Sequence, residues 1–157
     1  MKEYKAVIFG EPVAQGRPRF FRRGNLVKAY DPTKSREYKK YIQLIAKYNA
    51  PKTPVTGAVI LSLKIYRKIP KVMSSKKRAA ALSGKLRPTT KPDVSNILKG
   101  VEDALKGIWY ADDSQIVAYG EVGKWYSSQP RIEVTMQEIE DEQHGKVQGM
   151  RQRDSLD

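Results

Sequence analysis

An uninterrupted helical periodicity between Val94 and Ile108 constrains the fold of this chain more than any other feature. At 100° per residue, the apolar positions share one arc of roughly a third of a turn, the pattern of a helix that buries one side. These positions are Val94, Ile97, Leu98, Val101, Ala104, Leu105 and Ile108. Gly107 stands where a helix C-terminal glycine is expected. The sequence therefore predicts an amphipathic helix packed against a core.

The segments around this helix predict the remaining elements. Asp31 and Pro32 form a good cap and first-turn pair for a second helix, which ends before Pro51. Runs rich in β-branched and aromatic residues predict four strands, at 4–10, from Val55 toward Pro70, at 114–122 and at 131–137. The order β-α-β-α-β-β makes this an α+β protein, with a small mixed sheet and two main helices.

Two further segments are less regular. Residues 15–28 are predicted to be a loop, and the basic segment after Pro70 to be a loop or to contain a short helix between Lys76 and Leu82. From Glu138 onward almost no apolar residue is present, so residues 138–157 are predicted to be a flexible polar tail behind a domain at 1–137. His144 falls in this tail and is expected to be a surface residue rather than a base.

The chain's length and composition narrow the class of protein. A chain of 157 residues can bury one hydrophobic core, and with no cysteine it uses neither disulfides nor thiolate metal ligands. No apolar run approaches the length of a membrane span. We therefore expect a cytoplasmic protein with no membrane partner.

The charge of the chain is its first functional signal. Thirty Lys and Arg against 17 Asp and Glu give a formal net charge of +13, which favours a polyanionic partner such as nucleic acid. Two stretches, 15–28 and 67–91, contain no acid. Their candidate nucleic-acid-binding residues are Arg17, Arg19, Arg22, Arg23, Lys76, Lys77, Arg78 and Lys91. Solvated loops or a purely structural nucleic-acid binder would have the same composition.

The polar side of the Val94–Ile108 helix permits two interpretations. Asp93, Asn96, Lys99, Gly100 and Asp103 share an arc, as the solvated face of any amphipathic helix would. Three details favour an active site instead. Asp93 lies in the first turn, where the helix dipole stabilises a carboxylate. Asn96 and Lys99 are not the usual Glu and Lys mixture of an exposed face. Asp112 and Asp113 follow a glycine-containing turn that can reverse the chain.

Adjacent carboxylates at the entrance of a strand point to opposite faces, so only one of Asp112 and Asp113 can share a site with Asp93. A pair of carboxylates from different elements, in a protein that attracts phosphates, is what a Mg²⁺-dependent nuclease needs. Lys99 could then stabilise the phosphate in the transition state or the leaving oxygen.

These residues also resemble a known family. "KPDVSNILKGVEDAL" followed by "GIWYADDSQIV", from Lys91 to Val117, resembles the motif of the RusA family of Holliday junction resolvases. That motif runs D-x-D-N-x-x-K, then D-A-L, then D-D-x-Q-V after a short aromatic turn. The resemblance implies a small α+β homodimer that resolves four-way DNA junctions by paired, Mg²⁺-dependent nicks, one from each subunit.

Position by position, the resemblance makes Asp93, Lys99 and Asp113 catalytic, and Asp93 and Asp113 the metal ligands. Asn96 matches the motif asparagine, and Asp103 matches the D-A-L aspartate, for which a supporting or structural role and a catalytic role both stay open. The cofactor it implies is Mg²⁺, with Mn²⁺ as a possible substitute.

Ser95 departs from the family pattern, which has a second aspartate at that position. A serine hydroxyl can ligate Mg²⁺ but brings no charge, so it predicts weaker metal binding. Three accounts remain open: a tolerated variant, compensation by Asp103 or Asp112, or a binding protein with feeble nuclease activity.

The sequence thus predicts a homodimeric endodeoxyribonuclease that acts on branched DNA in recombination and repair. Phe20 and Phe21, in a basic segment, are candidates for a wedge at the junction centre. The rival hypothesis is a non-catalytic or weakly catalytic binder of branched nucleic acid, whose carboxylates serve only as caps and solvated charges.

Overall fold

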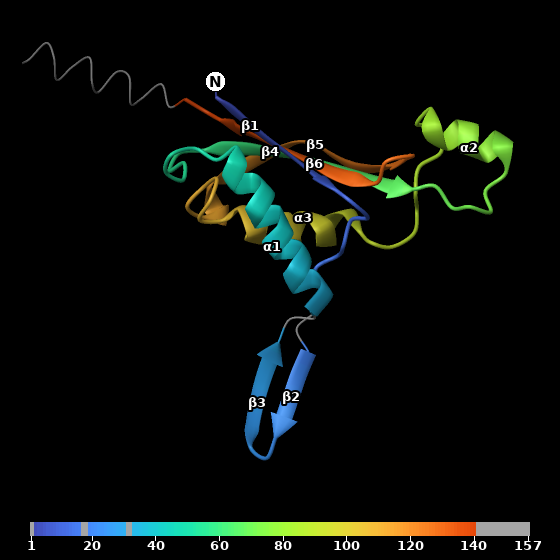
Figure 1. Ribbon diagram of the computed structural model, residues 1–157. Coiled ribbons are helices and arrows are strands. Elements are labelled where there is room, and N and C mark those ends of the chain that lie inside the picture. Colours follow the sequence, from blue (N-terminus) through green and yellow to red (C-terminus); the bar gives the residue numbers. More distant parts are fainter. Residues whose placement is uncertain (1, 17–18, 31–32, 141–157) are drawn as a thin grey trace, which may run out of the picture.

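The computed structural model describes residues 2–16, 19–30 and 33–140, without the side chains at 19–21, 23 and 26–30. A four-stranded sheet carries two helices on one face (Figure 1). These elements are β1 (Glu3–Phe9), α1 (Thr33–Tyr48), β4 (Val59–Lys68), α3 (Val94–Leu105), β5 (Ile116–Ser127) and β6 (Arg131–Glu138). The strand order is β1-β6-β4-β5, and only β4 and β5 run parallel. The predicted α+β class with a mixed sheet is confirmed.

Strict alternation along the central strands makes one face of the sheet apolar. Leu61, Leu63 and Ile65 of β4 are fully buried, and their neighbours in sequence are only half-buried. Each of the three lies opposite another buried residue of β6, namely Met136, Val134 and Ile132. The helices α1 and α3 cover this face and pack on each other through their own buried residues, which include Ile42 of α1 and Val101 of α3.

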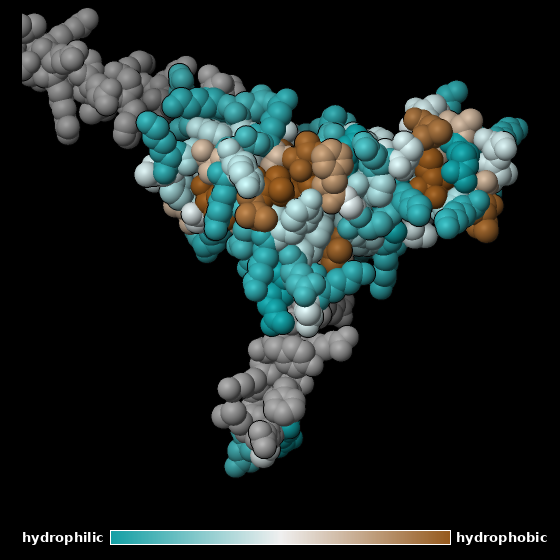
Figure 2. Space-filling view, viewed as in Figure 1, coloured by the Kyte–Doolittle hydropathy of each residue, from teal (hydrophilic) through white to brown (hydrophobic). Residues whose placement is uncertain are grey.

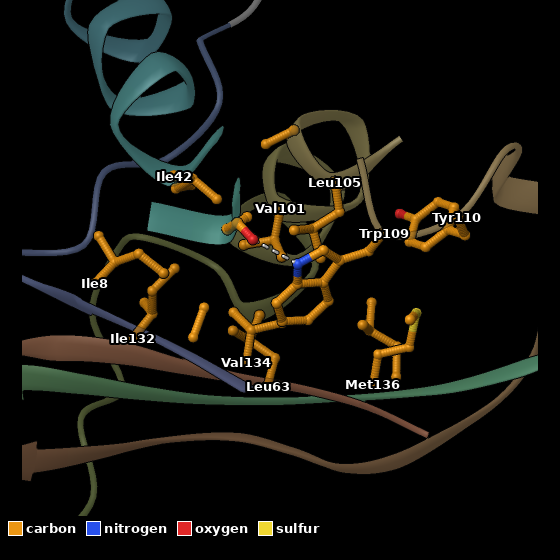
Figure 3. Close-up of a cluster of buried hydrophobic side chains, with 14 of the residues drawn as sticks. Ile8, Ile42, Leu63, Val101, Leu105, Trp109, Tyr110, Ile132, Val134 and Met136 are labelled. Carbon is orange, nitrogen blue, oxygen red and sulfur yellow. Dashed lines mark hydrogen bonds between the residues drawn. The ribbon is translucent and has the colours of Figure 1, made fainter. Parts of the chain in front are cut away.

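Trp109 lies between the helices and the sheet (Figure 3). Its side chain is fully buried, and the indole N–H donates a hydrogen bond of 3.0 Å to the carbonyl oxygen of Ala46 in α1. The ring of Tyr4 lies 6.4 Å away, centroid to centroid. Tyr110 is also fully buried. The two aromatics therefore anchor the turn that follows α3 to the core.

Two elements have other bounds than predicted, one because of Gly107 and one because Val55 pairs outside the sheet. α3 ends at Leu105 rather than Ile108, because Gly107 adopts a φ of +82°, outside the helical region. The strand predicted from Val55 begins at Val59. Val55 instead bonds with the turn after α3: its N–H donates to the Trp109 carbonyl (2.9 Å), and its carbonyl accepts from Ala111 (3.1 Å).

The loop prediction for residues 15–28 is wrong, because most of this segment forms a β-hairpin. β2 (Arg19–Arg23) pairs antiparallel with β3 (Leu26–Tyr30). Gly24 has a φ of +61°, as the first position of a tight two-residue turn demands. The hairpin projects from the body of the molecule beyond α1 (Figure 1).

The short helix considered after Pro70 is present as α2 (Ser75–Leu82). Ser74 caps it, its hydroxyl oxygen accepting from the backbone N–H of Lys77 at 3.3 Å. Residues 69–86 form an arm, here called the α2 arm, that projects from the end of β4 (Figure 1).

The described surface is mostly hydrophilic in the view of Figure 2, with apolar residues gathered over part of the sheet and on the α2 arm. Within residues 2–16, 19–30 and 33–140, no helix is long and apolar enough to cross a membrane. Most of the predicted tail, including His144, lies outside the described residues, so that prediction stays open.

Candidate active site

Part of the polar side of α3 is covered by another segment of the chain, at Gly100 and Asp103. The side-chain amide of Gln15 donates a 2.7 Å hydrogen bond to a carboxylate oxygen of Asp103. A methyl group placed on Gly100 would lie 3.5 Å from the Cβ of Gln15, which is ordinary van der Waals contact. Asp103 therefore ties the segment that follows β1 to α3, and its role at the site stays a prediction.

An open cleft lies where this segment, the start of α1 and the start of α3 meet. Residues that line it are Glu11, Pro12, Val13, Ala14, Lys34, Lys91, Pro92, Asp93 and Asn96. Asp93 is the N-cap residue of α3, yet its side chain makes no capping hydrogen bond. Its exposed carboxylate is therefore available to a ligand, with the lysines of the cleft nearby.

The other predicted residues of α3 are placed along its exposed side. Lys99 and Ser95 are exposed, and Asn96 is half-buried at the cleft. Like Asp93, Lys99 makes no hydrogen bond or ion pair with any residue in the described part of the chain. A cation left without a partner on a cleft-forming helix can serve a phosphate.

Asp112 is engaged in holding the turn. It is the N-cap of a short 3-10 helix (Asp113–Gln115), and its carboxylate accepts from the Ser114 hydroxyl at 2.5 Å and lies 3.1 Å from the Lys106 ammonium. These two contacts, that of Ser114 the larger, lower the pKa of Asp112 to about 2. The stability that these contacts give the folded protein is fully present above the ordinary pKa of an aspartate, and it is lost as the pH falls through about 2.

Asp113 lies in different surroundings from Asp112. It is half-buried, and its Oδ1 atom is buried without a hydrogen-bond partner in the described structure. Burial raises the pKa of Tyr110, and the Asp113 charge raises it further. The Tyr110 hydroxyl donates to the Glu102 carbonyl at 2.7 Å. A hydrogen bond to Glu102, together with burial and the charges of Glu102 and Asp113, raises the pKa of Tyr119 to about 12. Asp113 therefore lies beside the C-terminal half of α3.

The two aspartates predicted to bind metal are thus held at different ends of α3. Glu102 is nine positions after Asp93, which corresponds to about 13 Å of helix rise. Within residues 2–16, 19–30 and 33–140, no group of three or more Asp, Glu, His or Cys side chains could hold a metal ion. The donors themselves suit a hard cation, since the orphaned oxygen of Asp113 and the uncapped carboxylate of Asp93 are both oxygen ligands.

The predicted nucleic-acid-binding residues divide between the two projections and the cleft. Lys76 and Lys77 are exposed on α2, where Arg78 also donates to the carbonyl oxygens of Pro70 and Lys71 (3.2 and 3.4 Å). Lys91 is exposed at the cleft, and Arg22 on the hairpin. The side chains of Arg17, Arg19, Arg23, Phe20 and Phe21 lie outside the described structure.

Sequence reasoning missed Lys34 and Glu11, which both line the cleft. Glu11 was detectable, because it is the sole acid between Glu3 and Asp31 and directly follows the end of the first strand. Lys34 carries no such signal, since basic residues are common at every exposed position of this chain.

Comparison with known proteins adds a family match that covers this site. The family described as endodeoxyribonuclease RusA matches residues 10–137. A protein of Bacillus subtilis (strain 168), described as "Uncharacterized protein YqaN", is 49% identical over 137 residues. That alignment covers 86% of this chain and 96% of the relative. The family match extends from the segment along α3 through β6 and includes every residue of the cleft.

Proposed function

Because the chain belongs to the RusA family of endodeoxyribonucleases, we propose that it is a Mg²⁺-dependent nuclease that resolves four-way DNA junctions in recombination and repair. The observation that carries the proposal is Asp93. Its carboxylate makes no capping hydrogen bond and has no partner among the described residues, at a cleft where Lys34 and Lys91 supply the charge to hold a phosphate. The net charge of +13 favours the approach of DNA.

Each proposed role follows from the contacts that a residue makes or lacks. Asp93 and Asp113 offer carboxylate oxygens to the metal. When bound, Mg²⁺ supplies an activated water and positive charge against the phosphate oxygens. Lys99, which has no partner in the part of the chain that the structure describes, stabilises the charge that develops on the phosphate or its leaving oxygen. Asp103 keeps the cleft wall in place through Gln15.

The separation of Asp93 and Asp113 bears on how they cooperate. For both to bind one ion, either the turn at Asp112–Gln115 moves toward the cleft, or a second copy of the chain supplies one of the two. A homodimer is the proposed form in either case, since a two-fold junction that is nicked symmetrically requires two sites related by a two-fold axis.

Incubation of a labelled four-way junction with and without Mg²⁺ tests the proposal. We expect paired nicks that appear only with the metal, and no cutting of a linear duplex of the same sequence. The rival function is that of a binding protein. It is supported instead if the protein shifts the junction in a gel but never nicks it, with Mg²⁺ or with Mn²⁺.

Ser95→Asp is expected to lower the Mg²⁺ concentration at half-maximal nicking, by about tenfold if the new carboxylate acts as a ligand or orients one. The physical reason is that a charged oxygen then stands two positions after Asp93, where the family has an aspartate. Ser95→Asn, which adds a similar volume without charge, is the matched control. An unchanged Mg²⁺ requirement in Ser95→Asp means that this position does not face the metal.

Replacing both Lys76 and Lys77 by Ala is expected to weaken junction binding and to make the affinity less dependent on salt concentration. If each lysine contacts one phosphate, the slope of log affinity against log salt falls by about 2. Binding is measured by fluorescence anisotropy between low and physiological salt. The control replaces Lys47 and Lys52, two exposed lysines in the last turn of α1 and just after it. Equal slopes in the two double variants would exclude the α2 arm from the DNA interface.

A further inference from the structure

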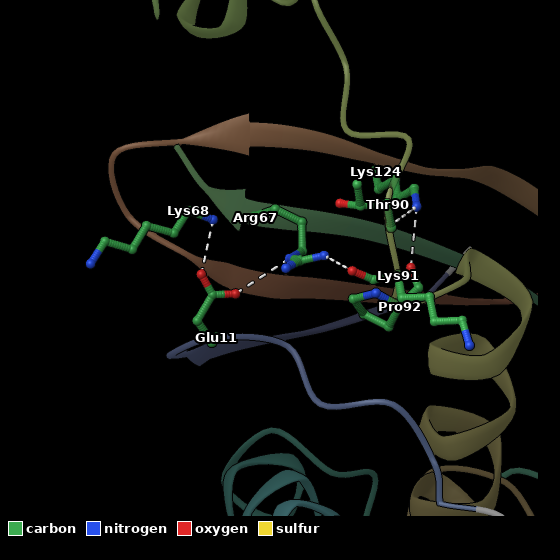
Figure 4. Close-up of polar contacts among 7 residues, drawn as sticks. All are labelled: Glu11, Arg67, Lys68, Thr90, Lys91, Pro92 and Lys124. Atoms are coloured by element: carbon green, nitrogen blue, oxygen red, sulfur yellow. Dashed lines mark hydrogen bonds and ion pairs between the residues drawn. The ribbon is translucent and has the colours of Figure 1, made fainter. Parts of the chain in front are cut away.

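The loop between α2 and α3 delivers Asp93 to the cleft and is held by its backbone carbonyls. The ammonium group of Lys124 lies 2.7 Å from the carbonyl oxygen of Thr90 and 3.2 Å from that of Pro92. Arg67 donates from Nη1 to the carbonyl oxygen of Lys91, which lies between them (Figure 4). Three consecutive carbonyls directly before Asp93 therefore each accept a hydrogen bond from a cation.

Both cationic side chains come from strands of the central sheet. Arg67 is on β4 and Lys124 on β5, two neighbouring strands. Lys124 pairs in register with Ile65, and Arg67 continues the alternation that buries Leu61, Leu63 and Ile65. Both side chains therefore point to the face that α3 covers, at the border of the core. Hydrogen bonds from charged donors are roughly twice as strong as neutral ones.

Arg67 also joins the two walls of the cleft. Its Nε lies 3.4 Å from Oε2 of Glu11, an ion-pair distance, and its side chain is only 23% exposed. The other carboxylate oxygen of Glu11 accepts the backbone N–H of Lys68 at 3.0 Å. Glu11 and Lys91 both line the cleft. One guanidinium thus fixes the wall that follows β1 relative to the wall that precedes α3.

A second anchor holds the start of the same loop. Arg87 donates to the Lys124 carbonyl at 2.9 Å, and its guanidinium lies 4.2 Å from the centroid of the Trp125 ring. A Cβ at Gly123 would lie 2.7 Å from Nη2 of Arg87 and 2.9 Å from the indole, so only glycine leaves room for this stack. The loop is therefore tied to β5 at Arg87 and again at Thr90 to Pro92.

We propose that Arg67 and Lys124 are positioning residues for Asp93. They fix the backbone that carries its carboxylate, and so set how that carboxylate meets a divalent cation at the cleft. The inference rests on the proposed function, in which Asp93 is a metal ligand. Neither residue touches the metal or the reacting phosphate in this role, and both act through the carbonyls of residues 90–92.

The test measures Mn²⁺ affinity of the full-length protein by electron paramagnetic resonance, apart from any nicking. Lys124→Met removes the donor and keeps the length of the side chain. We expect about a tenfold weaker Mn²⁺ affinity, since the loss of groups that orient metal ligands costs ~10–100-fold. Lys64→Met is the matched control, because Lys64 is on β4, half-exposed, and its ammonium lies 3.4 Å from the Glu121 carboxylate rather than at the loop before Asp93. It should leave the affinity within twofold of wild type.

A double-mutant cycle separates positioning from general stability. In the Asp93→Asn background, Lys124→Met should have no further effect on Mn²⁺ affinity, because the ligand that it positions is already gone. An equal loss in both backgrounds overturns the proposal, as does wild-type affinity in a folded Lys124→Met protein. If Lys124→Met does not fold, Arg67→Lys takes its place. It keeps the charge but not the fork that reaches both Glu11 and Lys91, and the same cycle applies.

The two proposals fail in distinguishable ways. If wild type binds Mn²⁺ and nicks junctions while the Arg67 and Lys124 variants match it, only the positioning role is wrong. If wild type neither binds Mn²⁺ nor nicks, the proposed nuclease function fails, and the positioning role is overturned with it.

Discussion

Asp93→Asn and Asp113→Asn should each reduce nicking of a four-way junction by more than about 100-fold, since even groups that only orient a metal ligand contribute ~10–100-fold. Asparagine keeps the shape of the side chain and removes the charge that a hard cation requires. Junction binding without metal should be unchanged or tighter, because negative charge near phosphate is lost. Single-turnover nicking and gel shifts measure the two effects separately.

Asp112→Asn is the matched control, because Asp112 is adjacent in sequence but faces Lys106 and Ser114. It should leave the nicking rate within a few-fold of wild type while weakening the turn. Unchanged cutting by Asp113→Asn, with loss in Asp112→Asn, would show that the wrong aspartate was assigned to the metal.

Mixing the two inactive variants tests whether Asp93, at the start of α3, and Asp113, near its other end, act from one chain or from two. If a second copy supplies one aspartate, mixed dimers of Asp93→Asn and Asp113→Asn contain one intact site, and nicking of single strands returns. If the turn moves within one chain, every chain in the mixture lacks a ligand and activity stays absent. The readout is the ratio of single nicks to paired nicks.

Trp109→Ala should lower the free energy of unfolding by about 3–5 kcal/mol, the usual cost of truncating a buried Trp. Trp109 is fully buried between α1 and the sheet, and its indole N–H is bonded to the Ala46 carbonyl. The variant therefore leaves a cavity and removes one hydrogen bond to the Ala46 carbonyl, which still accepts the backbone N–H of Asn49 at 3.2 Å. Urea denaturation measures the change in the free energy of unfolding, from the shift of the unfolding midpoint when the two proteins have the same m-value.

The other Trp of the chain provides the comparison. Trp125 is half-buried, with Arg87 over its ring and the ring of Tyr66 at 5.9 Å. Trp125→Ala should cost less than Trp109→Ala, since solvent already reaches the ring and the indole donates no hydrogen bond to any residue that the structure describes. A cost equal to that of Trp109→Ala would mean that the core does not centre on Trp109.

The periodicity of apolar residues in the sequence predicted the helices and strands that pack one side against the core. The spacing from Val94 to Leu105 identified α3, and the alternation at Leu61, Leu63 and Ile65 identified β4, because both patterns record contact with the core. The hairpin at residues 19–30 was missed although Gly24 and Asn25 form a recognisable two-residue turn. Its basic residues had favoured a loop instead.

Contacts between distant segments of the chain could not be predicted from such patterns. Gln15 meets Asp103 and Lys124 meets Thr90 only because the fold brings their segments together. Their side chains obey no periodicity that would mark them. The candidate site residues were predicted from the polar side of α3 and the family motif, whereas the cleft around Asp93 required the structure.

Parallel strands need a crossover connection, and here a single crossover from β4 to β5 contains α2, α3 and the whole motif. Arg87 is tied to Trp125 after the α2 arm has ended and before Asp93 is reached. Under the proposed function, we therefore expect changes of length or sequence within residues 69–86 to alter DNA binding and to leave the backbone geometry before Asp93 unchanged.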